Sequence, residues 1–293
     1  MTDTENYRNA WFPRGSKPTL TQMSTICFRV TRSCNLACSY CQAPPNSRQL
    51  SERELLDALA WFAGKGTKKI KFTGGEPFVY RGILNLIEGC RSMSMQPTII
   101  TNGTHLPKGA VDCLITQRAR VKVSLHGPRD LHDAIQGTGL YERTLRTLRL
   151  LISAGIETSV HTLLYRDNKL DLEKWIDLLA GEGVHKVSFM AFVPRGRGES
   201  LRRDWQLSST TSSYLGQRIG ELAELYDGRI VVRYLDFVNM AYLVFETDGR
   251  LEWQIGDGSA DSYLASISPI GLKIPSAENL REKRAKRDPR VLG

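Results

Sequence analysis

The chain has 293 residues, of which 41% are hydrophobic and 24% charged, and 40 lysines and arginines against 31 aspartates and glutamates give a net charge of +9. This composition is that of a globular protein with a substantial core, and it excludes collagen-like, low-complexity and disulfide-scaffold proteins. The N-terminus is polar and no apolar run approaches the length of a membrane span, so we expect a cytoplasmic protein that does not enter a membrane.

Short β-branched runs alternate with amphipathic stretches along most of the chain. This alternation predicts parallel strands connected by crossover helices. The expected strands cover residues 25–30, 69–72, 98–101, 121–125, 157–162 and 186–192. Six strands are a natural count for a partial barrel, so the predicted fold class is α/β, a partial (β/α)6 TIM-like barrel with a small C-terminal α/β extension.

The pattern divides the chain into four segments. We expect a lead segment (1–20), a core domain (21–198), an extension (199–275) and a basic tail (276–293), which holds six basic and three acidic residues. The extension should contain a helix over 214–226 and strands over 230–235, 242–246 and 250–255, the last two joined by the Asp248-Gly249 turn of a hairpin.

Two of the expected helices carry clear start and stop signals. Ser51 and Glu54 have the spacing of a capping box, and Gly64 follows as a stop. A second helix is predicted over 141–154, where apolar residues recur every three or four positions before Gly155. Both helices should lie on the outside of the barrel.

Cys34, Cys38 and Cys41 follow the first predicted strand with the spacing C-x3-C-x2-C. Three thiolates on one short loop can ligate three irons of a cubane iron-sulfur cluster. Since such clusters normally have four cysteine ligands, the fourth iron would remain open to another molecule. Clustered cysteines of this kind indicate a ligand set in a reducing compartment and not disulfides.

Zinc is the alternative occupant of this loop, and it needs a fourth ligand. The other cysteines do not supply one at a familiar spacing: Cys27 lies within the first strand, and Cys90 and Cys113 lie on predicted helices. A zinc-binding protein without enzymatic activity therefore stays a remote alternative.

Two further motifs follow the next two strands. They are Gly74-Gly75-Glu76-Pro77 and Thr101-Asn102-Gly103, and Tyr40 is the aromatic residue before the last cysteine. In this order, each at the carboxyl end of a predicted strand, the three motifs resemble the signature of the radical S-adenosylmethionine (SAM) superfamily. The position fits, because β/α barrels bind ligands at that face.

The resemblance implies two cofactors, a [4Fe-4S] cluster on the three cysteines and SAM on its open iron. It implies an enzyme, an oxidoreductase or lyase, in which a one-electron donor such as flavodoxin or ferredoxin reduces the cluster. SAM cleavage would then give a 5′-deoxyadenosyl radical that abstracts hydrogen from a substrate. The residues implied to contact SAM are Tyr40 near the adenine, Gly74, Gly75, Glu76 and Pro77 around the ammonium group, Asn102, and Ser124 at the ribose or carboxylate.

The pattern is most similar to the group that contains the molybdenum-cofactor cyclases, viperin and the peptide-modifying maturases. Many of these have further cysteines near the C-terminus for an auxiliary cluster. This chain has no cysteine after Cys113, so we expect one cluster only.

The candidates for substrate contact or catalysis are His126, Arg195 and Arg197. His126 follows the fourth strand and could bind substrate or move a proton, or it could be a loop histidine fixed by hydrogen bonds. The glycine-spaced arginines after the sixth strand suit a carboxylate or phosphate, or a solvated loop.

The leading hypothesis is a single-cluster radical SAM enzyme that acts on a small, anionic or sugar- or nucleotide-like metabolite. The alternative is a radical SAM maturase of a short peptide. Nucleic acid is not an expected partner, because no RNA-binding motif is recognisable.

Overall fold

The computed structural model describes residues 12–13, 23–46, 49–238, 240–256, 261–268 and 271–273. The predicted basic tail and all of the lead segment except 12–13 lie outside these residues. In the part of the chain that is described, no helix is long and apolar enough to cross a membrane.

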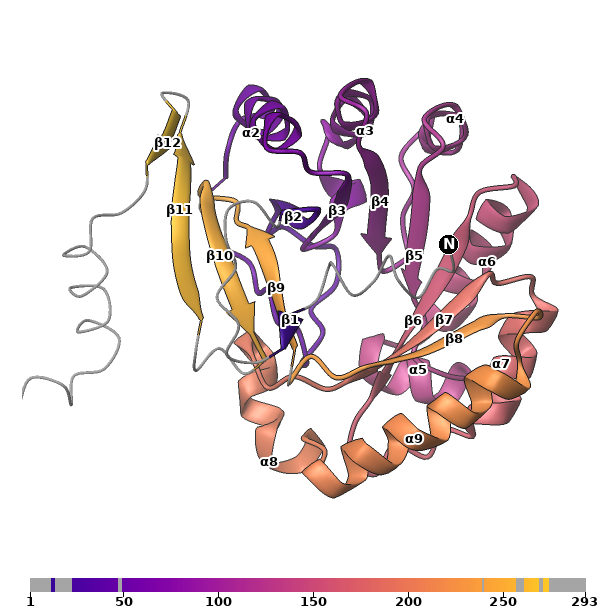
Figure 1. The fold of residues 1–293 in the computed structure, drawn as a ribbon. Coiled ribbons are helices and arrows are strands. Elements are labelled where there is room, and N and C mark those ends of the chain that lie inside the picture. The colour runs from indigo at the N-terminus through magenta and orange to yellow at the C-terminus, as the bar shows by residue number, and fades with distance from the viewer. Residues whose placement is uncertain are drawn as a thin grey trace, which may run out of the picture.

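The six predicted strands are confirmed, and they pair in parallel in chain order (Figure 1). A seventh parallel strand, β8, pairs with β7 and extends this series at one edge. The parallel strands are β2 (Thr25–Thr31), β3 (Lys69–Gly74), β4 (Gln96–Thr101), β5 (Arg120–Ser124), β6 (Thr158–Leu164), β7 (Lys186–Ala191) and β8 (Val231–Leu235).

The predicted hairpin is also confirmed, and it lies at the other edge. β9 (Met240–Phe245) pairs in parallel with β2 and antiparallel with β10 (Arg250–Ile255). The sheet continues through β11 (Ser262–Ser268) to β12 (Gly271–Lys273), and β1 (Phe12–Pro13) pairs with β9. Segments of the expected extension thus lie at both edges of one sheet, which is open because no described pairing joins β8 to β12.

Most of the helices lie along the outer side of the curved sheet (Figure 1). The helices are α2 (Glu52–Gly64), α3 (Ile83–Ser92), α4 (Ala110–Thr116), α5 (Arg129–Gln136), α6 (Leu140–Ser153), α7 (Leu172–Gly181), α8 (Arg202–Trp205) and α9 (Ser209–Leu225), with 3-10 turns at η1 (Pro77–Val79) and η2 (Gly196–Leu201). Of these, α5 and α8 lie near Tyr40 of the cysteine loop.

The capping box of α2 forms as predicted. Glu54 Oε2 accepts from the Ser51 backbone N–H at 2.8 Å, and Ser51 Oγ accepts from the Glu54 N–H at 3.4 Å. One face of the helix then packs on the sheet through Leu55, Ala58, Leu59 and Phe62.

Side chains alternate between the two faces of each parallel strand. On β2, Ile26, Phe28 and Val30 join the core beneath the helices. Their neighbours, among them Cys27 and Arg29, therefore face the interior of the barrel. The same alternation on the other strands makes the interior polar, while the main apolar core lies between sheet and helices.

Candidate active site

The three cysteines lie on the loop that follows β2 and carry free thiols. The Leu36 N–H donates to Cys34 Sγ at 3.4 Å, and the Cys41 N–H donates to the Cys38 carbonyl at 3.3 Å. Burial raises the pKa of the Cys34 and Cys38 thiols. The chemistry of three thiols on one loop fits the three cysteine-held corners of a [4Fe-4S] cluster.

A single-ion site is a different arrangement, because its ligands must converge on one point. Among the residues that the structure describes, no three histidine, cysteine, aspartate or glutamate side chains are placed to hold one metal ion. Three cysteines that each bind a different iron do not have to converge in this way.

Gly74 and Gly75 support the loop through their backbone. The Gly75 N–H donates to the Thr31 carbonyl at 2.7 Å and the Glu76 N–H to the Ser33 carbonyl at 2.9 Å. A Cβ at Gly74 or Gly75 would lie 2.0 Å from one of these oxygens, so no side chain fits there. The glycines thus contact the cysteine loop itself, and their expected approach to SAM stays a prediction.

Glu76 is buried and connects this motif to the Thr101-Asn102-Gly103 turn. Its Oε1 accepts from Thr101 Oγ1 at 2.8 Å and from the Phe78 N–H at 3.1 Å, and its Oε2 accepts from the Asn102 N–H at 2.7 Å. Burial raises the pKa of Glu76 to about 7. Pro77 is the first residue of the 3-10 turn η1, and its side chain is buried.

Asn102 in turn reaches the cysteine loop. Its Nδ2 donates to Asn35 Oδ1 at 2.9 Å and lies 3.9 Å from Cys34 Sγ. The three motifs named in the sequence therefore meet at one place. Ser124 ends β5 and pairs in register with His161 of β6, at the same end of the sheet.

Tyr40 is held by three residues from other parts of the chain. Its hydroxyl lies 2.8 Å from His126 Nε2 and 3.1 Å from Gln136 Nε2, and its ring stacks on Trp205 with centroids 6.3 Å apart. His126 Nδ1 accepts from the Leu163 N–H, so the proton of the neutral ring is on Nε2. The Nε2–H can then donate to the Tyr40 hydroxyl, which also accepts from Gln136 Nε2.

Burial lowers the pKa of His126 to about 3, so the imidazole is neutral at pH 7. This finding favours the interpretation of His126 as a histidine fixed by hydrogen bonds that positions Tyr40. Sequence reasoning did not identify Gln136, because its place opposite Tyr40 depends on how α5 packs.

Arg195 and Arg197 lie on the loop after β7, which packs on the cysteine loop. Arg195 forms an ion pair with both carboxylate oxygens of Asp261. Arg197 Nη1 donates to the Ala37 carbonyl at 3.1 Å, and its backbone N–H donates to the Cys41 carbonyl at 2.9 Å. In this structure both arginines contact protein, and their contact with substrate stays a prediction.

A buried ionic network that the sequence did not reveal fixes the start of the cysteine loop. Glu246 follows β9 and forms ion pairs with Arg29 of β2 and with Arg32, two residues before Cys34. Gln254 of β10 donates to the same carboxylate at 3.2 Å. The hairpin thereby braces the loop from the side opposite to η1.

The barrel interior holds a group of cations, which we call the interior cations: the buried Lys71, Lys122 and Lys186, and the half-buried Arg233. Lys122 Nζ lies 3.4 Å from His161 Nε2. Burial and the charges of the other three lower the pKa of Lys122. The sequence signal for Lys71 and Lys122 is the position of each between two apolar residues of a strand, as in Val121-Lys122-Val123.

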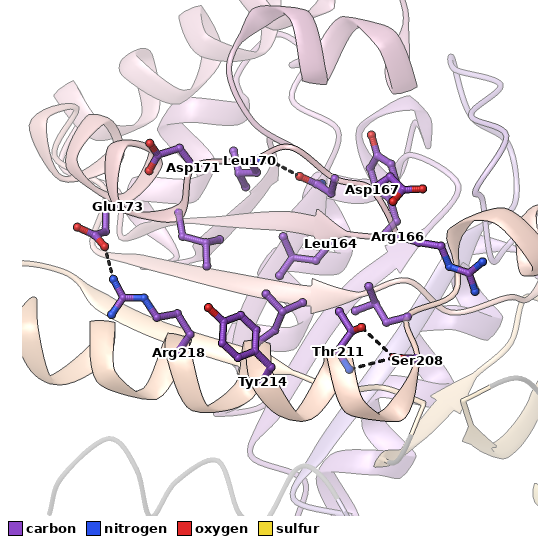
Figure 2. A pocket seen from close by; sticks show the side chains of 15 residues that line it. Leu164, Arg166, Asp167, Leu170, Asp171, Glu173, Ser208, Thr211, Tyr214 and Arg218 are labelled. Carbon is purple, nitrogen blue, oxygen red and sulfur yellow. Dashed lines mark hydrogen bonds and ion pairs between the residues drawn. The ribbon is translucent and has the colours of Figure 1, made fainter.

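A hollow of about 610 Å³ lies outside the barrel, between the loop after β6 and the helix α9 (Figure 2). Figure 2 shows Tyr214 of α9 beside this hollow, with Arg218 next to Glu173 at one end. The hollow borders the aromatic stack around Tyr40, because Tyr165 in its wall stacks on Trp205 at 4.2 Å.

The chain folds as a parallel, open β/α barrel with three cysteines on the loop at the carboxyl end of β2, the face at which such barrels bind ligands. The sequence profile of the radical SAM superfamily matches residues 28–179. The chain therefore belongs to the radical SAM superfamily, whose members use SAM and a [4Fe-4S] cluster.

Relatives of this chain differ in activity. It is 31% identical to the AdoMet-dependent heme synthase of Oleidesulfovibrio alaskensis over 60% of this chain and 47% of the relative. It is 28% identical to the GTP 3′,8-cyclase of Petrotoga mobilis over 61% of this chain and 58% of the relative. The chain thus spans about half the length of these curated relatives.

The fold is similar to that of solved radical SAM enzymes. The structure of anSMEcpe with bound AdoMet and the Cp18Cys peptide superposes with a TM-score of 0.63 at 16% identity, covering 80% of this chain and 77% of that one. This similarity confirms the predicted partial TIM-like barrel.

Proposed function

We propose that this chain holds one [4Fe-4S] cluster on Cys34, Cys38 and Cys41, cleaves SAM reductively, and acts on a small, anionic or sugar- or nucleotide-like metabolite. The observation that carries the proposal is the cysteine loop, which η1, the β7 loop and Glu246 brace from separate directions. The free state of all six cysteines agrees with a reducing compartment such as the cytoplasm.

When bound, the cluster and SAM supply a 5′-deoxyadenosyl radical that can abstract hydrogen. The residues of this chain hold and orient the reactants. Glu76 keeps the Asn102 turn beside Cys34, and His126 and Gln136 fix the Tyr40 ring, which is expected to pack near the adenine. Residues that are held rigidly around a bound molecule keep its reacting groups aligned.

The test is an assay of 5′-deoxyadenosine after anaerobic reconstitution with iron and sulfide and addition of SAM and dithionite. We expect 5′-deoxyadenosine to form slowly without substrate, and faster when a true substrate is added. A preparation that binds four irons per chain and forms no 5′-deoxyadenosine would contradict SAM cleavage. A preparation that binds zinc instead of iron would support the zinc-binding alternative.

The interior cations support an anionic substrate. Three of these, the lysines, are buried in the barrel, and an anion that enters it would meet several positive charges at once. A carboxylate or phosphate group of the substrate therefore suits this position.

Lys122→Met is expected to raise the KM for such a substrate about ten- to hundredfold while kcat changes less, since a hydrogen bond to a charged group contributes about 1.5–3 kcal/mol. Removing a buried charge should not lower the midpoint of unfolding. The measurement is 5′-deoxyadenosine formation against substrate concentration, with the exposed Lys68→Met as matched control. Equal KM values in the two variants would contradict the anionic-substrate proposal.

A peptide substrate is the second candidate, and the hollow beside α9 favours it. An extended peptide that entered the barrel past Trp205 could continue along this hollow, where the Tyr214 ring is 66% exposed. Tyr214→Ala should then lower turnover of a peptide and leave turnover of a small metabolite unchanged.

A further inference from the structure

A second hollow opens on the outer surface directly beside the cysteine loop. It has a volume of about 440 Å³. Its wall comes from the cysteine loop, the segment from η1 to α3, the loop before α4, and α6, and it contains Asn35, Phe78, Tyr80, Arg81, His105, Lys108 and Arg143. We call this region the basic hollow.

The basic hollow adjoins the first cysteine. Asn35, which is part of its wall, follows Cys34 in the chain, and its Oδ1 lies 3.9 Å from Cys34 Sγ. Asn35 is fixed there, because its Nδ2 donates to Thr104 Oγ1 at 2.8 Å and its Oδ1 accepts from Asn102. A molecule seated in the hollow would therefore lie next to a ligand of the proposed cluster.

The rim of the hollow is positively charged. Arg81, Lys108 and Arg143 are exposed, and none of them forms an ion pair with another described residue. These three side chains thus place positive charge where the surface approaches the cysteine loop.

We propose that the basic hollow is the docking site of an acidic one-electron donor protein of the flavodoxin class. The donor's reduced flavin would lose one electron and the cluster would gain it, with no bond formed or broken. Electron transfer requires the two centres to be close, and the basic hollow combines positive charge with a wall residue that directly follows Cys34. Opposite charges also steer the encounter and fix its orientation. This inference rests on the proposed function.

The test compares two reductants of the reconstituted enzyme. Purified flavodoxin, kept reduced by NADPH and its reductase, must dock before it delivers an electron, whereas dithionite is small and needs no docking site. The variants are Arg81→Glu, Lys108→Glu and Arg143→Glu. The matched controls are Lys65→Glu and Lys68→Glu, exposed residues in the turn before β3, at the opposite end of the strands.

Each variant in the hollow should slow flavodoxin-driven cluster reduction about tenfold at low ionic strength, with a smaller effect as salt is added. The dithionite-driven rate should equal that of the wild type, and the two controls should keep both rates. An unchanged flavodoxin-driven rate in the variants, or an equal loss in the controls or with dithionite, would overturn the proposal.

The measurement of cluster reduction is the loss of the cluster's visible absorbance, which does not depend on SAM. If the wild-type cluster is reduced by flavodoxin but no 5′-deoxyadenosine forms with either reductant, the proposed SAM cleavage fails while the docking site is still decided by the variants.

Discussion

Alanine at Cys34, Cys38 or Cys41 is expected to reduce the iron and sulfide content to a small fraction of the wild-type value and to abolish 5′-deoxyadenosine formation. Each thiolate is a ligand of one iron, and a loop with two ligands left cannot hold a cubane cluster firmly. The measurements are iron and sulfide content, visible absorbance and the 5′-deoxyadenosine assay on each reconstituted variant.

The chain contains matched controls for this experiment. Cys90 on α3 and Cys113 on α4 are buried in the core beneath the helices. Cys90→Ala and Cys113→Ala should keep the iron content and the activity of the wild type, with some loss of stability from the smaller side chain. Equal iron loss in these controls would show that misfolding, and not lost ligation, explains the result.

Glu246→Ala is expected to destabilise the protein by about 3–5 kcal/mol, since removal of one partner leaves buried charges uncompensated. Arg29 and Arg32 both depend on this carboxylate, and Arg29 is 6% exposed. The measurement is urea unfolding of the cluster-free protein under reducing conditions. The iron content of the reconstituted variant should also fall, because Arg32 precedes the cysteine loop.

The control for this second prediction is Glu142→Ala. Glu142 pairs with Arg129 at the surface, and such pairs contribute about 0–1 kcal/mol. If Glu246→Ala unfolds with the same free energy as this control, the buried network does not stabilise the loop as the structure suggests.

The role that a residue plays can differ from the role its type suggests. His126 was a candidate to move a proton, because an exposed imidazole titrates near neutral pH. The structure buries it against Tyr40 and Gln136, and burial lowers its pKa to about 3. Arg195, a candidate for anion binding, forms an ion pair with Asp261, and its contact with substrate stays a prediction.

Local patterns in the sequence determined the parallel barrel, its six central strands, the hairpin and the three motifs around Cys34. These follow from alternation, capping, turn residues and spacing, which involve residues close together in the chain. The glycines of the Gly74-Gly75 motif are equally local, although the carbonyl oxygens they accommodate belong to another segment.

Only the tertiary structure decided which side chains meet across the barrel. Glu246 contacts Arg32 across 214 positions, and Lys122 approaches His161 across 39. β8 extends the parallel series beside β7, whereas β9 pairs with β2, so the place of β9 in the sheet does not follow its order in the chain. Such contacts depend on strand register and helix packing, so buried charge, shifted pKa values and the basic hollow beside Cys34 emerge only once the chain is folded.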